Sequence, residues 1–338
     1  MNFYKTQKSK QVDWWKSYSN QPHWEDEKDK WGIQNKVSYP HIVKGNWLSL
    51  VWKGIQKELP AYLGNNIQAH SGVHNLLSSW VACANLYFPA HSNSEFKNLL
   101  LGFLKSKISS DIAEVLEVEL EYSLDGDLSP KELLGEMEGG RGSGQTSPDV
   151  AFVVKTSKGI GLILTECKYT EHSFYRCSAR RTTDRGDKPL NPNPEKCLQH
   201  ASACDYKSIP CHQHVWGRKY LDHFQLTDEG KKLLTRCPAA TAGYQLVRQQ
   251  ALANGIYKSG KYDFVVSSVS FDSRNKTLIE CLNRTGIKDF QSGWSDIYQK
   301  GASFITWHHQ EWVDYVRKNF KDPIFIDWLN YMEERYGY

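Results

Sequence analysis

The chain has 338 residues, of which 40% are hydrophobic and 13% aromatic. This composition is typical of a folded protein and excludes a chain that is disordered throughout. Its 42 basic and 38 acidic residues leave a formal charge of only +4, so any surface for nucleic acid must come from local clusters of charge. No apolar run approaches the roughly 20 residues that span a bilayer. We therefore expect a cytoplasmic protein without a membrane segment.

The N-terminal region combines lysines with tryptophans, as in Trp14-Trp15-Lys16, and shows no clear periodicity. We predict an irregular arm over residues 1–45 that is held to the core by its aromatic side chains. The same aromatic residues could instead stack on nucleic-acid bases. Ser94 is the expected N-cap of the last of three helical patterns, which lie at about 47–59, 70–87 and 94–113.

An alternating segment and a glycine-rich segment come next. Residues 118–122 alternate with period two, which predicts a strand with Glu119 and Glu121 on one face. The stretch 139–145 surrounds Arg141 with four glycines. Such a loop could let a substrate backbone approach closely, and a plain surface loop explains the glycines equally well.

The most informative part of the sequence is a pair of apolar runs joined by the polar turn Lys155–Gly159, which predicts a β-hairpin. If the turn is centred between positions 157 and 158, paired positions sum to 315 and Asp149 lies opposite Glu166. Directly opposed residues share a face of the sheet. Lys168 follows Glu166 by two positions and points to that face as well.

The three side chains would place two carboxylates beside one ammonium group. Close carboxylates repel, so we expect a divalent cation between them, and Mg²⁺ commonly uses one or two protein carboxylates. Asp149 and Glu166 would hold Mg²⁺, or Mn²⁺ as the alternative ion, with the backbone carbonyl of Cys167 as a further candidate ligand. Lys168 would orient water or stabilise developing charge during phosphodiester hydrolysis. A surface salt bridge among the three residues is the alternative without chemistry.

These residues also follow the pattern of a known superfamily. Pro148-Asp149 and Glu166-Cys167-Lys168 resemble the motif of the PD-(D/E)xK, or restriction-endonuclease-like, nucleases. The extension Tyr169-Thr170-Glu171 and the upstream Glu121-Tyr122-Ser123 resemble a restriction endonuclease group within that superfamily. The resemblance covers about residues 70–175 and continues more loosely through Tyr244–Arg248. In the helix at 75–86 that group usually carries Gln where this chain has Trp80.

The resemblance implies an α/β fold, a mixed sheet flanked by helices, and metal-dependent cleavage of DNA. Glu121 is then the best candidate for an additional acidic ligand, and Glu171 for support from outside the ligand set. We expect a nuclease core over residues 46–272, with an inserted segment rich in Cys and Arg at about 171–237. A helical extension over 273–338 would pack on that core.

Several residues outside the motif are candidates for contact with DNA. Arg176, Arg180 and Arg181 lie in a mildly basic loop that leaves the strand of Lys168, although charged loops often only face water. A helix is expected from Ala239, after Pro238, to Gly255, followed by a strand at 261–269. Its side chains Gln245 and Arg248 would face phosphate or the attacking water, or else solvent.

The cysteines leave the question of a second metal open. Cys197, Cys204 and Cys211 recur every seven residues, with Cys177 upstream. Zinc sites usually contain pairs two to four residues apart, and ferredoxin-type clusters also use short gaps. A structural zinc ion or an iron–sulfur cluster is therefore conceivable but not favoured.

Taken together, the sequence predicts a Mg²⁺-dependent DNA endonuclease that acts in restriction or defence against foreign DNA. A DNA-repair nuclease is the nearest alternative, because the same core serves repair enzymes. A nucleic-acid-binding protein without activity is the alternative from another class. DNA is the expected partner, and the sequence leaves a homodimer open.

Overall fold

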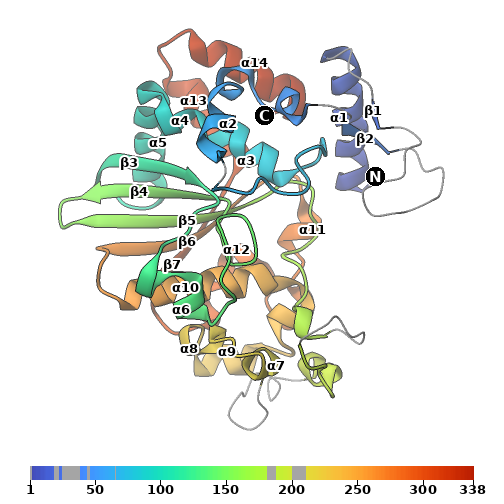
Figure 1. Cartoon of the computed structure of the whole chain (residues 1–338), viewed down its shortest axis with the longest axis vertical. Coiled ribbons are helices and arrows are strands. Elements are labelled where there is room, and N and C mark those ends of the chain that lie inside the picture. Colours follow the sequence, from blue (N-terminus) through green and yellow to red (C-terminus); the bar gives the residue numbers. More distant parts are fainter. Residues whose placement is uncertain are drawn as a thin grey trace.

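The computed structural model describes residues 2–18, 23–24, 39–43, 46–64, 66–180, 188–199 and 211–338. Its centre is a five-stranded mixed sheet with the order β3-β4-β5-β6-β7 (Figure 1). The first three strands are antiparallel neighbours, and β5, β6 and β7 run parallel. The expected α/β class is confirmed. The strands are β3 (Ile112–Leu120), β4 (Val150–Thr156), β5 (Ile160–Lys168), β6 (Phe264–Phe271) and β7 (Ser303–His308).

The β4–β5 hairpin has the predicted register. Val150 pairs with Thr165, so paired positions sum to 315. The turn is closed by the amide of Thr156, which donates to the carbonyl of Gly159 at 2.8 Å. Apolar side chains alternate between two cores along both strands, because successive residues of a strand point to opposite faces. The arithmetic on the turn therefore located both strands and their faces correctly.

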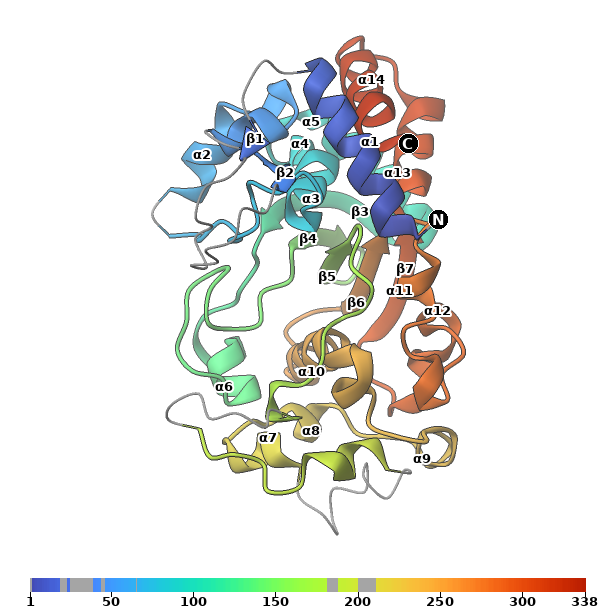
Figure 2. The same ribbon diagram turned by 90° about the vertical axis from the view of Figure 1, so that its right-hand side faces the viewer.

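One face of the sheet packs against a layer that joins both ends of the chain (Figure 2). Phe152, Ile163 and Val266 point into this core. Its aromatic side chains include Trp80, Trp312 and Trp328, which are almost fully buried. The helices of this layer are α1 (Phe3–Tyr18), α2 (Glu58–Leu63), α3 (Ser79–Tyr87), α4 (Pro89–Ser92), α5 (Ser94–Lys107), α13 (His309–Asn319) and α14 (Ile324–Tyr336).

The opposite face packs on α10 (Tyr244–Lys258), which follows a single π-helical turn at Ala239–Gly243. Ala151, Leu162 and Leu164 point into this second core. The rest of the chain outside the first layer forms shorter helices, several of which lie below α10 in Figure 1. They are α6 (Pro130–Leu134), α7 (His212–Val215), α8 (Tyr220–His223), α9 (Asp228–Leu233), α11 (Lys276–Ile279) and α12 (Phe290–Gly293).

The N-terminal region differs from the expected irregular arm. Residues Phe3–Tyr18 form a regular helix, and Trp14 and Trp15 on it are buried. A short two-stranded sheet follows, made of β1 (His23–Trp24) and β2 (Tyr39–Val43). The prediction of an irregular arm is thus wrong for α1, whereas the anchoring role of its tryptophans is confirmed.

Other boundaries also differ. The helix expected over 70–87 begins only at Ser79, and Asn93 rather than Ser94 caps α5, since its side chain accepts from the amides of Glu95 and Phe96. Helix α10 continues through Gly255 to Lys258. Residues 303–308 form the edge strand β7, so the last segment is not helical throughout. Within the described residues, no helix is long and apolar enough to cross a membrane.

Candidate active site

Asp149, Glu166 and Lys168 meet at one end of the hairpin, on the face that carries α10. The Nζ atom of Lys168 donates to Oε1 of Glu166 at 2.7 Å. Asp149 lies directly before β4, and its Oδ2 accepts the amide of Cys167 at 2.8 Å. Glu166 is 7% exposed and Lys168 only 3% exposed. Asp149 is half-buried, so Glu166 and Lys168 form a buried ion pair beside it rather than a salt bridge on the surface.

Glu121 adds a third carboxylate beside the trio. It follows the last residue of β3, has a positive φ of 49°, and is 5% exposed. Its amide donates to the carbonyl of Asp149 at 3.0 Å. A positive φ is uncommon for a residue with a side chain. The backbone thus leaves the regular strand at the point where Glu121 joins the cluster.

Arg141 holds this end of β3 in place. Its Nε donates to the carbonyl of Glu121 at 3.0 Å, and its Nη2 pairs with Oε2 of Glu119 at 2.7 Å. The adjacent Gly142 has a φ of 77°, and a Cβ there would lie 2.3 Å from the carbonyl oxygen of Gln68. The glycine-rich loop therefore packs closely on its own chain here, and Arg141 supports Glu121.

The charges in the cluster shift one another's protonation. Burial, reinforced by the nearby Asp149 and Glu166, raises the pKa of Glu121 to about 9. Burial and the charge of Glu166 also raise the pKa of Asp149 well above its ordinary value. Burial alone would lower the pKa of Lys168, but Glu166, Glu171 and Asp149 outweigh it and keep the ammonium charged. The buried Lys168 ammonium thus faces the carboxylates of Glu166, Glu171 and Asp149.

Helix α10 contributes Gln245 to the cluster but not Arg248. The amide Nε2 of Gln245 donates to Oε1 of Glu166 at 2.8 Å, while its Oε1 is buried without a hydrogen-bond partner. Arg248 instead pairs with Glu136 at 3.0 Å. Glu136 also binds the amide and hydroxyl of Thr146. Arg248 is thus held in a polar network with Glu136 and Thr146.

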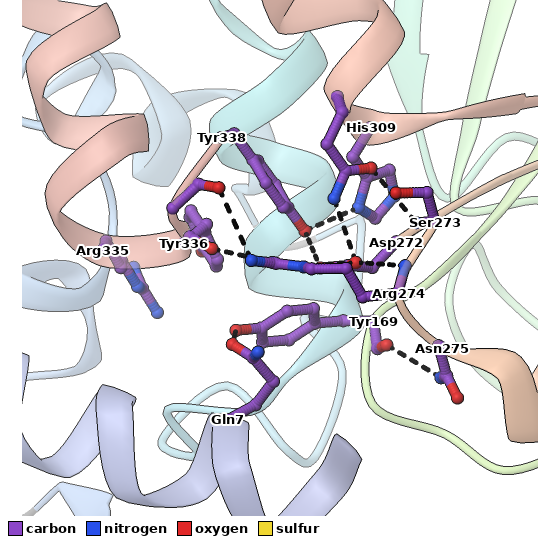
Figure 3. A network of polar contacts seen from close by, with 12 residues as sticks. Gln7, Tyr169, Asp272, Ser273, Arg274, Asn275, His309, Arg335, Tyr336 and Tyr338 are labelled. Atoms are coloured by element: carbon purple, nitrogen blue, oxygen red, sulfur yellow. Dashed lines mark hydrogen bonds and ion pairs between the residues drawn. The ribbon is translucent and has the colours of Figure 1, made fainter.

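The loop that follows Lys168 is fixed by a polar network (Figure 3). Asn275 Nδ2 donates to the carbonyls of Tyr169 and Glu171, at 3.0 and 2.8 Å. The hydroxyl of Tyr169 donates to Oε1 of Gln7 on α1 at 3.0 Å. Glu171 in turn accepts the amide of Tyr169 at 2.8 Å. The loop therefore holds both Lys168 and the charge of Glu171 near the cluster.

Asp272, just beyond β6, is the centre of the same network (Figure 3). It accepts from Nε of Arg274 at 2.8 Å and from the hydroxyl of Tyr338 at 3.1 Å. Burial opposes its ionisation, but Arg274 outweighs burial and holds the pKa of Asp272 below its ordinary value. His309 contacts the Tyr338 hydroxyl at 3.0 Å, and burial lowers the pKa of His309 to about 4. The last residue of the chain is thus part of the support behind β5.

Two aromatic residues flank the cluster. Tyr175 has a positive φ of 58°, and its ring centroid lies 5.6 Å from Nζ of Lys168. It sits in a loop without periodicity, so no sequence signal pointed to it. Trp80 is 2% exposed and lies near Glu121, where it opposes the rise in the pKa of that carboxyl. In this chain an indole therefore occupies the position where the resembling group carries Gln.

The remaining arginines lie farther along the loop. Arg176 is exposed and lines a cleft of about 480 Å³ with His172 and Arg284. Arg180 donates to the carbonyl of Ala240 at 3.1 Å and is therefore tied to the protein. Arg181 lies outside the described residues.

The cluster suits a hard divalent cation. Within the described part of the chain, no group of three or more His, Cys, Asp or Glu side chains is arranged to hold a metal by itself. Mg²⁺ needs only one or two carboxylates, because water and substrate supply its other ligands. The N–H and C=O of a strand residue point to the same side, so the carbonyl of Cys167 faces the Asp149 side as its amide does. The residues present therefore fit Mg²⁺.

The mixed sheet flanked by helices is consistent with a restriction-endonuclease-like α/β domain. A family described as restriction endonuclease associating with ARP has a sequence model that matches residues 11–337. The chain belongs to this restriction endonuclease family. Comparisons with curated proteins and with solved structures found no significant match.

Proposed function

We propose that the protein is a Mg²⁺-dependent DNA endonuclease of the PD-(D/E)xK type. The observation that carries this proposal is the cluster of Asp149, Glu166 and Lys168, with the Nζ of Lys168 2.7 Å from Glu166. The restriction endonuclease family supports DNA as the substrate. Perturbed pKa values in such a cluster are typical of catalytic sites.

Each residue has a defined task in this proposal. Asp149 and Glu166 would hold Mg²⁺, with the Cys167 carbonyl as third protein ligand, and Glu121 would add negative charge beside them. When bound, the ion lowers the pKa of water and neutralises charge on the phosphate. The Lys168 ammonium stabilises the negative charge that develops on the phosphate oxygens. The unpartnered Oε1 of Gln245 can accept a hydrogen bond from the attacking water.

Restriction, or another defence against foreign DNA, is the role we propose for this activity. The family description supports it and also names an association with ARP. We accordingly propose that this chain acts together with ARP as well as with DNA. Pull-down of the tagged chain from its host with and without DNA, followed by identification of retained proteins, tests this part.

Cleavage assays test the activity itself. Plasmid DNA is incubated with the protein in Mg²⁺, in Mn²⁺ or in EDTA, and nicks are expected only with the metals. Asp149→Asn should abolish cleavage, because the amide oxygen can still accept the Cys167 amide but no longer carries charge. The matched control is Glu138→Gln, whose side chain is 84% exposed outside the cluster.

The outcome separates enzyme from binding protein. Cleavage that persists in EDTA, or that survives in Asp149→Asn, would refute the assignment. DNA binding of normal affinity without any cleavage under all metal conditions would favour a binding protein on a nuclease fold.

A further inference from the structure

Four cysteines from four separate segments line one apolar cavity below α10. They are Cys177, Cys197, Cys211 and Cys237, and Ala239 and Phe224 complete part of the wall. The cavity offers about 40 Å³ of space, whereas a single water needs roughly 10–15 Å³ on the same kind of measure. The cavity that these cysteines line therefore has room for more than one atom.

Backbone contacts bring these segments together. The amide of Cys177 donates to the carbonyl of Ala239 at 2.9 Å, and that of Cys237 donates to the carbonyl of Cys197 at 3.0 Å. Gln213, two residues after Cys211, donates to Sγ of Cys177 at 3.0 Å. The convergence thus results from tertiary structure and not from spacing along the chain.

These sulfurs do not have the properties of reactive thiols. Burial raises the pKa of Cys177 to about 11 and that of Cys211 to about 12, and the neighbouring Cys237 contributes to both shifts. Nucleophilic and redox-sensing cysteines instead have lowered pKa values. Cys177, Cys197 and Cys211 also form no disulfide. Four sulfurs that line one cavity suit a cationic centre, which binds them as thiolates.

We propose that Cys177, Cys197, Cys211 and Cys237 ligate an iron–sulfur cluster of the four-iron type. Such clusters are held by four cysteine thiolates. Zinc is the less suitable occupant, since Zn–S bonds of about 2.3 Å draw four sulfurs tightly around one ion. No described set of side chains is gathered closely enough for a single ion. Arg180 and Lys196 lie near Cys197 and would offset the negative charge of a thiolate-bound cluster.

The iron–sulfur cluster would connect the inserted segment to the start of α10. Gln213 donates both to Cys177 and to the hydroxyl of Tyr244, the latter at 3.1 Å. The amide of Gln245 donates to the carbonyl of Phe174 at 3.0 Å. Loss of the iron–sulfur cluster should therefore loosen the two segments that carry Gln245 and Tyr175.

Metal analysis of the full chain purified without oxygen tests the proposal. We expect about four iron and four acid-labile sulfide per chain, with broad visible absorbance that bleaches on exposure to air. Cys211→Ser and Cys237→Ser should each lose most of the iron. The matched control is Cys281→Ser, a partly buried thiol outside the cavity, which should keep it. Cys204 lies outside the described residues, and Cys204→Ser should keep the iron as well.

The alternative results are distinct. Zinc at one equivalent without iron, or a chain that contains neither iron nor zinc, would refute the proposed iron–sulfur cluster. Full iron content in Cys211→Ser and Cys237→Ser would overturn the ligand set. If Cys237→Ser fails to fold, the iron and sulfide content of the wild type and of the partly exposed Cys211 variant decides the question.

Discussion

Glu121→Gln should stabilise the metal-free protein at neutral pH. Glu121 is 5% exposed, and burial with the charges of Asp149 and Glu166 raises its pKa from 4.5 to about 9. The folded protein therefore keeps a proton that the unfolded chain has released, and stability falls as pH rises from 4.5 towards 9. Glutamine has nearly the same shape and no charge to titrate, so it removes this loss.

The size of the effect follows from the two pKa values. A pH of 7 is about 2.5 units above the pKa of this carboxyl in the unfolded chain, and one pKa unit corresponds to about 1.4 kcal/mol. The variant should therefore unfold with a free energy about 3 kcal/mol larger than that of the wild type at pH 7. The difference should fall to almost nothing below pH 4.5 and grow to about 5 kcal/mol near pH 8.5.

Urea unfolding in EDTA, followed by tryptophan fluorescence at about pH 4, 7 and 8.5, measures these differences. Glu117→Gln is the matched control, because Glu117 is exposed on the same strand and its loss should change stability by less than about 0.5 kcal/mol. Saturating Mg²⁺ should stabilise the wild type and narrow the gap. Equal stability of variant and wild type at all three pH values would refute the reasoning.

Three further changes test separate parts of the structure. Lys168→Ala should abolish cleavage and lower the free energy of unfolding by about 3 kcal/mol, since it removes one partner of a buried pair; plasmid nicking beside urea unfolding checks both effects. Burial lowers the pKa of His309 to about 4 in the folded protein, so the wild type should lose about 3 kcal/mol of stability as the pH falls from about 6.5 to 4. His309→Gln should remove this loss. An unchanged slope of melting temperature against pH would contradict this. Gly142→Ala should destabilise the fold and weaken cleavage, because its Cβ would lie 2.3 Å from the Gln68 carbonyl and 3.2 Å from Cδ of Glu121; retention of wild-type melting temperature and activity would show that the loop can move.

The hairpin could be predicted because two local rules determine it. A short polar turn sets the register, and the period of two sets the face. The shared face of Asp149, Glu166 and Lys168 follows from these rules, and the pairing of Val150 with Thr165 confirms the register of the two strands. Gln245 could be assigned to a helix, but the direction of its side chain could not be predicted. Its contact with Glu166 depends on how α10 packs on the sheet.

The parts that sequence reasoning missed depend on partners far away in the chain. Helix α1 buries Gln7 and Gln11 among its apolar residues, so its sequence shows no clear apolar stripe. Both glutamines form hydrogen bonds with the hydroxyl of Tyr169. Arg248 seemed free to face phosphate because its partner Glu136 lies 112 positions away. Rules based on ligand spacing could not identify Cys237 as a candidate ligand, because only the tertiary structure brings it next to Cys197.

The energetics of the cluster argue for a ligand. A buried ion pair adds little stability even when its geometry is good, and here the Lys168 ammonium faces both Glu166 and Asp149. Burial and mutual repulsion push the pKa values of Asp149 and Glu121 upward, so each ionised carboxylate costs free energy in the absence of a further cation. A sequence that only had to fold would be more stable with apolar residues there. This cost supports our proposal that the carboxylates hold a divalent ion, which would compensate these charges.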